Sequence, residues 1–239
     1  DSLLIAWELL VSFDPGLYAV VGRSLALSAI ACALACVLGL SAGSFLALRD
    51  FPGRSALLTV LNTSLALPSV VVGLAVYLLL SRSGPLGFLG WLFSFKAMVV
   101  AQTILVLPVV TALTRQVIAQ ADRMQGEGLR SMGASTLMRA CLLTWNERFA
   151  LMTVVLTGFG RAVSEVGAVM IVGGNMEGFT RVMTTSIALE TSKGELPIAL
   201  GLGIVLLVVV LLLNVLMGWV VRAGRHGTTD NDAPRGAVA

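Results

Sequence analysis

Long apolar segments separated by short polar ones dominate this chain. The apolar segments are bounded by charged residues, Gly or Pro, and cover about residues 24–48, 56–80, 97–119, 149–173 and 196–221. Each is long enough to cross a bilayer, because a helix needs roughly 20 mostly apolar residues to span the hydrocarbon core. Barrel strands would alternate apolar and polar residues, which these segments do not, and open strands leave backbone groups unpaired in lipid. The pattern therefore predicts an all-α integral membrane protein with five transmembrane helices.

The composition supports a membrane location. Hydrophobic residues make up 57% of the chain and charged residues 12%, with a mean hydropathy of +0.93, whereas about a quarter of the residues of a globular protein are charged. We expect one transmembrane domain over residues 1–222. Its first sixteen residues are too short and too interrupted to span, so we interpret them as interfacial. Residues 223–239 are rich in Gly and polar residues and predict a mobile cytoplasmic tail.

The basic residues predict the orientation, because five spans place the connecting segments alternately on two sides. One side carries Arg49, Arg54, Arg115, Arg123, Arg130, Arg139, Arg148, Arg222, Arg225 and Arg235. The other side carries Arg82, Lys96, Arg181 and Lys193. The positive-inside rule places the first set in the cytoplasm, with the N-terminus outside, the C-terminus inside and a cytoplasmic loop over about residues 120–146. Anchoring to the inner leaflet explains the net charge of +3, so no nucleic-acid partner is expected.

The cysteines and the histidine predict neither a disulfide nor a metal site. Cys32 and Cys36 lie in the first span and Cys141 in the cytoplasmic loop, so we interpret them as small apolar side chains. His226 is the single histidine, and no cluster of metal ligands is visible.

Small residues and prolines inside the spans predict close packing and bends. Gly39 and Gly43, continued by Ala31 and Ala35, form a small-xxx-small pattern that permits close helix approach. Pro68 and Pro108 each remove a backbone hydrogen bond and should bend the second and third helices. Such bends serve either packing geometry or gating.

The fourth span contains two charges, Arg161 and Glu165, which are expensive at bilayer depth unless they pair or face water. Their i,i+4 spacing places them on one helical face. They are either a buried structural pair or the border of a hydrophilic pathway for a charged solute. Both hold if the pair lies beside the pathway and orders it.

The segment 173–195 follows this span and is rich in hydroxyl groups. Thr180, Arg181, Thr184, Thr185 and Ser186 can donate hydrogen bonds to an oxyanion without forming a tight cationic site. The alternative is a solvated helix and turn at the membrane surface.

No phosphate-binding loop occurs in this sequence. Lys96 and Lys193 follow Phe95 and Ser192, so neither completes the Gly-Lys-Ser/Thr end of such a loop. Any ATP hydrolysis therefore belongs to another subunit, and no cofactor is expected in this chain.

The predicted cytoplasmic loop contains an amphipathic segment. Its apolar stripe is flanked by Glu127, Arg130 and Arg139 and consists of Leu129, Met132, Met138 and Cys141. Gly133 permits a turn between two short helices. The segment suits either a groove of a cytoplasmic partner or the membrane surface.

The same segment, 127–134 (EGLRSMGA), resembles the coupling-loop motif of ABC importer permeases, whose usual form is Glu-Ala-Ala, three residues, Gly. It departs from that form at both alanines. Thr144-Trp145 also stands where many members have Leu-Pro.

Further segments resemble the molybdate, sulfate and tungstate permeases of that family. They are 67–74 (LPSVVVGL), 83–87 (SGPLG), 160–168 (GRAVSEVGA), Gly174-Asn175 and 178–181 (GFTR). The segment 182–191 (VMTTSIALET) is most similar to the tungstate permeases.

The resemblance implies a type I fold in the plasma (inner) membrane and a homodimer surrounded by lipid. Each subunit would dock one cytoplasmic ATPase, which binds ATP and Mg, and a periplasmic or lipid-anchored protein would deliver the oxyanion. The residues implied in ATPase coupling are Glu127, Gly128, Leu129, Arg130, Met132, Gly133 and Ala134. Those implied along the substrate pathway are Arg161, Glu165, Asn175, Thr180, Arg181, Thr184 and Thr185.

The sequence therefore predicts the non-enzymatic transmembrane subunit of an ATP-driven oxyanion importer, with tungstate as the expected cargo. Molybdate or sulfate is the alternative cargo. Two other classes are an ATP-independent secondary transporter or channel and a structural subunit of a membrane complex. Inverted repeats would favour the secondary transporter, but five spans do not divide into equal halves.

Overall fold

The computed structural model describes residues 15–229, and every regular element in this range is a helix. The elements are α2 (Pro15–Leu48), α3 (Arg54–Leu65), α4 (Ser69–Leu80), the 3-10 helix η1 (Gly87–Leu89), α5 (Phe95–Ser131), α6 (Thr136–Asn146), α7 (Arg148–Val163), α8 (Gly167–Gly173), α9 (Met183–Lys193) and α10 (Leu196–Thr229). Residues 1–14 of the segment expected to be interfacial, and 230–239 of the expected tail, lie outside the described range. Residues 223–229 continue α10.

Three of these helices, α2, α5 and α10, are long and apolar enough to cross a membrane. Two bent pairs pass the same test when each is taken as one span: α3 with α4, bent by 105°, and α7 with α8, bent by 56°. The described residues thus provide between three and five candidate spans.

The prolines of the second and third spans differ in effect. Pro68 precedes α4 with φ −62° and ψ 131°, and the chain turns sharply there, so the predicted bend is confirmed. Pro108 lies inside α5, which continues on both sides of it. α5 also extends to Ser131, so much of the segment expected to be a loop is helical.

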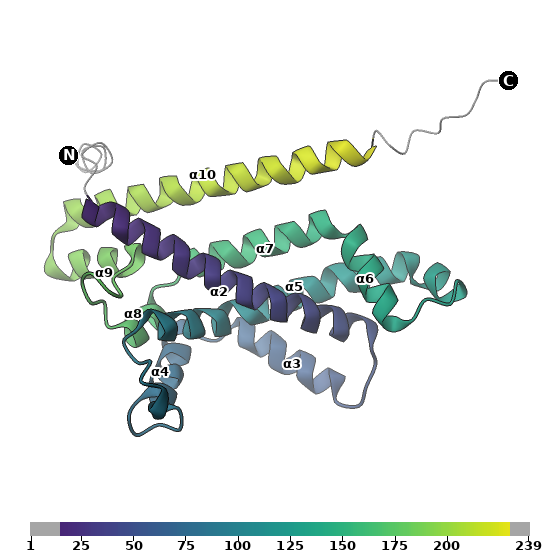
Figure 1. Ribbon diagram of the computed structural model, residues 1–239, viewed down its shortest axis with the longest axis horizontal. Helices are drawn as coiled ribbons and strands as arrows, with labels where there is room; N and C mark the ends of the chain where they lie inside the picture. Colours follow the sequence, from purple (N-terminus) through teal and green to yellow (C-terminus); the bar gives the residue numbers. More distant parts are fainter. Residues whose placement is uncertain (1–14, 230–239) are drawn as a thin grey trace.

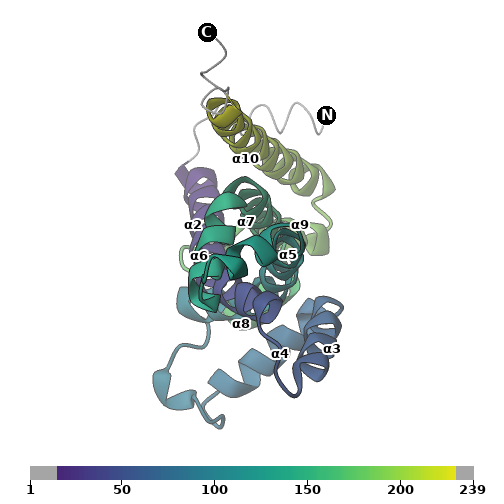
Figure 2. The same cartoon turned by 90° about the vertical axis from the view of Figure 1, so that its right-hand side faces the viewer.

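The helices form an elongated bundle around α5 (Figures 1 and 2). α2 and α7 both contact α5 and each other. α3 and α4 lie on one side of this bundle, and α10 lies on the opposite side. The start of α2 and α9 lie at one end of the molecule, whereas α6 lies at the other (Figure 1).

Close packing of α2 on α5 depends on glycine. A Cβ built on Gly39 would lie 2.8 Å from Cγ1 of Val110, and one built on Gly43 would lie 2.7 Å from the carbonyl oxygen of Thr111. Ala31 and Ala35 are fully buried. The predicted small-residue contact is therefore confirmed, and α5 is its partner.

The short helix α8 lies in the core between α4 and α5. A Cβ on Gly73 of α4 would lie 2.7 Å from the Cα of Ala168, so the two backbones approach closely. Val169 and Val172 of α8 are buried in one cluster with Met98 of α5. This packing fixes α8 after the break in the fourth span.

Candidate functional site

The fourth span is interrupted between Val163 of α7 and Gly167 of α8, inside the apolar bundle. Such a break frees backbone groups that need partners where water is absent. Ser164 donates its hydroxyl to the carbonyl of Arg161 at 3.1 Å, and the backbone N–H of Glu165 donates to the carbonyl of Ala162 at 3.1 Å. The N–H of Ser164 donates to the carbonyl of Gly160 at 3.2 Å, and side chains supply the further partners.

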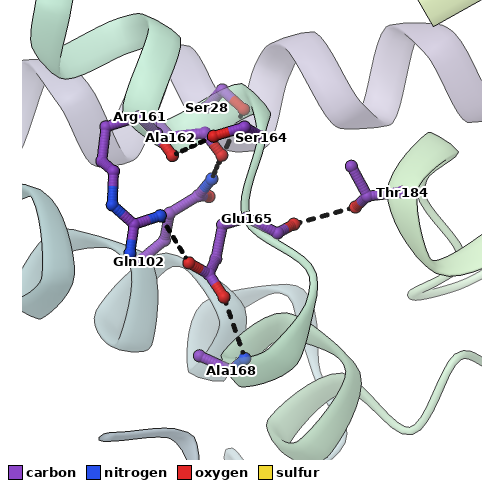
Figure 3. Close-up of polar contacts among 8 residues, drawn as sticks. All are labelled: Ser28, Gln102, Arg161, Ala162, Ser164, Glu165, Ala168 and Thr184. Carbon is purple, nitrogen blue, oxygen red and sulfur yellow. Dashed lines mark hydrogen bonds and ion pairs between the residues drawn. The ribbon is translucent and has the colours of Figure 1, made fainter. Parts of the chain in front are cut away.

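Glu165 connects the two halves of the broken span. Its Oε2 accepts from Nη1 of Arg161 at 2.7 Å, and its Oε1 accepts from the backbone N–H of Ala168 at 3.2 Å (Figure 3). Arg161 occupies the last turn of α7, where a cation is favourable, and the carboxylate lies at the start of α8, where an anion is favourable. The carboxylate side chain is 3% exposed and the arginine side chain 37%. The predicted i,i+4 pair is therefore present, with only the arginine reaching the surface.

Helices distant in the sequence supply the other contacts of the break. Thr184 of α9 donates its hydroxyl to the carbonyl of Glu165 at 2.9 Å. Gln102 of α5 donates its amide to the carbonyl of Ala162 and lies 3.5 Å from Oγ of Ser28 on α2 (Figure 3). The break is thus held by α2, α5 and α9 together.

Gln102 and Ser28 were missed by the sequence interpretation, although both carry a visible signal. A glutamine in the middle of an apolar span is costly unless it has a partner. Ser24 and Ser28 lie one helical turn apart on α2, and both are buried. Oγ of Ser24 accepts from the backbone N–H of Met183 at 2.7 Å, so this face of α2 also holds the start of α9.

Other residues expected along a substrate pathway lie in the connection between α8 and α9 and at the start of α9. Thr180 donates its hydroxyl to the carbonyl of Gly173 at 2.6 Å, and Thr185 donates to the carbonyl of Val182 at 3.0 Å. Like Thr184, both are buried and have already committed their hydroxyl protons to a carbonyl. In this conformation the three hydroxyls hold the backbone and cannot donate to an anion.

Asn175 and Arg181 have local partners as well. Asn175 adopts φ 50° and donates its amide to the carbonyl of Thr185 at 3.3 Å. Arg181 pairs with Glu177 at 3.2 Å. Of the residues expected along the pathway, the structure brings Arg161, Glu165 and Thr184 together at the break.

The second candidate site is the corner between α5 and α6. Gly133 adopts φ +79°, its N–H donates to the carbonyl of Arg130 at 2.9 Å, and the N–H of Ala134 donates to the carbonyl of Leu129 at 3.0 Å. These two bonds form a Schellman motif, which favours glycine at the left-handed residue. The predicted turn at Gly133 is confirmed, but it follows the long helix α5 and not a short one.

Asp122 ties this corner to the body of α5. Its carboxylate accepts from Arg139 of α6 at 2.8 Å and from Arg130 at 3.1 Å. Arg139 is buried, whereas Arg130 is exposed. A Cβ on Gly126 would collide with the Asp122 carboxylate, so glycine leaves room for this arrangement. The ion pairs of Asp122 therefore fix the position of the corner and of α6 relative to α5.

The surface of the corner combines apolar and charged side chains. Glu127 and Gly128 are exposed, Ala134 is partly exposed, and Leu129 packs partly against the core. The large exposed apolar side chains of the corner and of α6 are Met124, Met132, Leu137, Met138, Leu142 and Trp145. The expected stripe is thus mostly at the surface, where a partner can reach it.

Comparisons with known proteins show which proteins the whole chain resembles. The family model described as "Binding-protein-dependent transport system inner membrane component" matches residues 36–226. The tungstate uptake system permease protein TupB of Peptoclostridium acidaminophilum is 41% identical over 90% of this chain and 94% of its own length. TupB of Campylobacter jejuni is 38% identical over 90% of each chain. A probable anion ABC transporter permease protein of Haloferax volcanii is 40% identical over 84% of this chain and 88% of its own length.

Proposed function

Because the chain belongs to the family of binding-protein-dependent transport system inner membrane components, we propose that it carries tungstate inward as the permease subunit of an ABC transporter. It is a multi-pass membrane protein with apolar helices. The observation that carries the cargo assignment is the similarity to tungstate uptake permeases over nine-tenths of the chain. Molybdate and sulfate, which are also tetrahedral oxyanions, are the alternative cargoes.

The proposed topology counts each bent pair as one span, which gives five. The end that carries α6 then faces the cytoplasm, the N-terminus lies outside and the C-terminus lies inside the plasma membrane. The supporting observation is the excess of arginine in the segments that this arrangement places inside.

The proposed partners are a second copy of this chain, two cytoplasmic ATPases that bind ATP and Mg, and a periplasmic or lipid-anchored oxyanion-binding protein. The corner between α5 and α6 supports the ATPase assignment because it is exposed, partly apolar and braced by Asp122. We assign the ATPase contact to Glu127, Gly128, Leu129, Arg130, Met132, Gly133 and Ala134.

The proposed mechanism uses α5 as the connection between the two sites. This helix has 37 residues and is therefore about 55 Å long. It carries Glu127 near the corner, and Gln102 on the same helix bonds the carbonyl before the break. Movement of the corner by the ATPases would thus displace the contact that holds the broken span.

Arg161 is the proposed electrostatic element of the pathway. Its side chain is partly exposed, and Glu165 offsets much of its charge. A half-neutralised cation attracts an oxyanion without forming the tight site that several unpaired cations would create. In this proposal the wall of the pathway is stabilised by Asn175, Thr180, Thr184 and Thr185, which donate hydrogen bonds to backbone carbonyls. Arg181 contributes through its ion pair with Glu177.

The test is radiolabelled tungstate uptake into proteoliposomes that contain the permease with its ATPase, supplied with the loaded binding protein. We expect uptake to require ATP on the side of the membrane that corresponds to the cytoplasm. Excess unlabelled tungstate should suppress this uptake more strongly than excess molybdate or sulfate does. Uptake that persists without ATP but stops when the ion gradient collapses would indicate a secondary transporter. The absence of any flux would indicate a structural subunit.

A further inference from the structure

A groove of about 920 Å³ opens where the end of α2, helix α6 and the start of α7 meet. Its floor is apolar and includes Leu40 and Leu48 of α2 with Leu151 and Val155 of α7. The charged residues of its lining are Arg49 and Arg148, and no carboxylate lines it. The groove is separate from the break in the fourth span and from the turn at Gly133, although Leu137, Cys141 and Trp145 of α6 line it.

The two arginines lie at one end of the groove, because α2 ends beside Arg49 whereas α7 begins at Arg148. From Leu40 to Arg49 the helix rises about 13 Å, which is close to half of the roughly 30 Å hydrocarbon core. In the proposed topology this stretch of α2 therefore matches the depth of one leaflet, and Arg49 lies at the end that faces the cytoplasmic head groups.

Neither arginine has a carboxylate partner among residues 15–229. The guanidinium carbon of Arg49 lies 5.9 Å from the ring centroid of Phe45, and that of Arg148 lies 4.6 Å from Phe149 and 5.4 Å from Trp145. Nη1 of Arg148 also donates to the carbonyl of Trp145 at 3.0 Å. Five arginines elsewhere in the chain do form ion pairs: Arg54, Arg130, Arg139, Arg161 and Arg181.

We propose that this groove binds one anionic phospholipid from the adjoining leaflet. One acyl chain lies along the apolar floor, and the phosphate group is held by Arg49 and Arg148. An amphiphile with an anionic head matches both the depth of the groove and its uncompensated positive charge, as basic pockets between transmembrane helices match anionic head groups. The acyl chain of a zwitterionic lipid can also lie along the apolar floor, but its head group has no net negative charge to pair with the arginines.

Quenching of Trp145, which lines the groove, tests this proposal without any measurement of transport. The permease variant carries Phe in place of Trp7, Trp91 and Trp219, so Trp145 is its single tryptophan. It is purified in complex with an ATPase whose tryptophans have also been replaced. It is placed in phosphatidylcholine nanodiscs containing increasing fractions of phosphatidylglycerol brominated on its acyl chains. We expect quenching at a lower lipid fraction than with brominated phosphatidylcholine.

The arginine variants decide whether charge causes the preference. Arg49→Gln and Arg148→Gln should each weaken apparent phosphatidylglycerol binding by about fivefold, the effect expected of one basic residue near a membrane surface. Arg123→Gln, at an exposed site on α5 outside the groove, should leave binding unchanged. Arg49→Lys and Arg148→Lys should retain most of the preference and control for folding.

Two results would overturn the proposal. Equal quenching by the two brominated lipids, unaffected by the arginine variants, would mean that the groove takes up bulk lipid without selection. Cross-linking between two copies through Cys141, which is exposed and lines the groove, together with no quenching, would mean that a second copy covers it. Because quenching needs no transported anion, failure here leaves the proposed transport function untouched, and the reverse also holds.

Discussion

At the scale of single residues, Arg161 and Glu165 differ in how deeply their side chains are buried. The carboxylate is almost inaccessible, whereas more than a third of the arginine side chain is exposed. The proposed hydrophilic pathway supplies water to the exposed Arg161 side chain when its partner is lost, whereas the Glu165 carboxylate stays buried. The structural cost of breaking the pair should depend on which partner is removed.

We predict that Arg161→Gln destabilises the protein more than Glu165→Gln does. The first change leaves a buried carboxylate without its cation, which costs about 3 kcal/mol or more. The second retains an acceptor for the Ala168 N–H and leaves a guanidinium that water can reach, at a cost of about 1 kcal/mol. Thermal unfolding of the purified variants in one detergent measures the difference.

The double variant Arg161→Gln/Glu165→Gln serves as the control for this pair. It should be more stable than Arg161→Gln alone, because no buried charge remains. Equal losses in the two single variants would contradict the assignment of Glu165 as the buried partner. Uptake assays on the same variants show whether the charges also act in transport.

At this scale the sequence predicted the spacing of the pair but not its surroundings. The i,i+4 interval follows directly from helical geometry. The capping of α8 by Glu165 could not be predicted, because it depends on where α7 stops. The hydrogen bonds that Thr180, Thr184 and Thr185 donate could not be predicted either, since the positions of their carbonyl acceptors depend on how the segment between α8 and α9 folds.

Among the elements, the contact between α2 and α5 depends on two glycines. α5 approaches Gly43 so closely that an added Cβ would meet both a backbone carbonyl and the side chain of Thr114. Neither neighbour is the flexible end of a long side chain. The contact can therefore accept a larger residue only if the two helices separate.

We predict that Gly43→Ala lowers stability by about 1–3 kcal/mol, the usual cost of overpacking. Gly22→Ala, on the same helix, is the matched control because no atom lies within 4 Å of its Cβ position. That change should be neutral or stabilising by up to about 1 kcal/mol, since alanine favours the helix. Thermal unfolding of both variants measures the contrast, and similar losses would contradict the proposed contact.

The corner between α5 and α6 offers a second matched pair of glycines. Gly133 adopts a left-handed conformation, whereas Gly128 lies inside α5, and neither has an atom near its Cβ position. Their difference is therefore one of backbone conformation and not of space.

We predict that Gly133→Ala weakens ATPase association, because a side chain in the left-handed region costs about 1–2 kcal/mol. Gly128→Ala should weaken association less than Gly133→Ala does, because alanine favours the helical backbone at residue 128 by up to about 1 kcal/mol. Gly133→Asn should retain more association than Gly133→Ala, since Asn tolerates this conformation. Co-purification with the ATPase provides the measurement, and full association of the Gly133→Ala variant would argue against a role for the turn.

For the whole molecule, the two ends of the bundle should lie on opposite sides of the membrane. α6 lies at one end and the connection to α9 at the other (Figure 1). Cys141 of α6 is exposed, whereas Cys32 and Cys36 are buried, so native Cys141 is a ready probe. Phe179 in the connection between α8 and α9 is exposed and supplies the opposite position.

We predict that a membrane-impermeant maleimide labels Cys141 in inverted vesicles but not in intact cells. A Phe179→Cys variant that also carries Cys141→Ser should show the reverse pattern. Cys32 and Cys36 should stay unlabelled in folded protein, which controls for unfolding. Labelling of both positions from the same side would contradict the five-span topology.

The sequence by itself determined the apolar segments, the charged pair at one helical turn and the glycine turn after α5. Each depends on spacing along a single segment, so local geometry was sufficient. The lengths of the helices did not follow from the sequence, since α5 continues through Pro108 and through polar residues to Ser131.

Only the tertiary structure decided which helical faces meet. Gln102 reaches a carbonyl sixty residues away, and Ser24 contacts the start of α9. Core-facing and lipid-facing surfaces are both apolar in a membrane protein, so hydrophobicity does not distinguish them. The hydrogen-bonded break and the groove lined by Arg49 and Arg148 therefore arise from how the helices pack, which no single segment encodes.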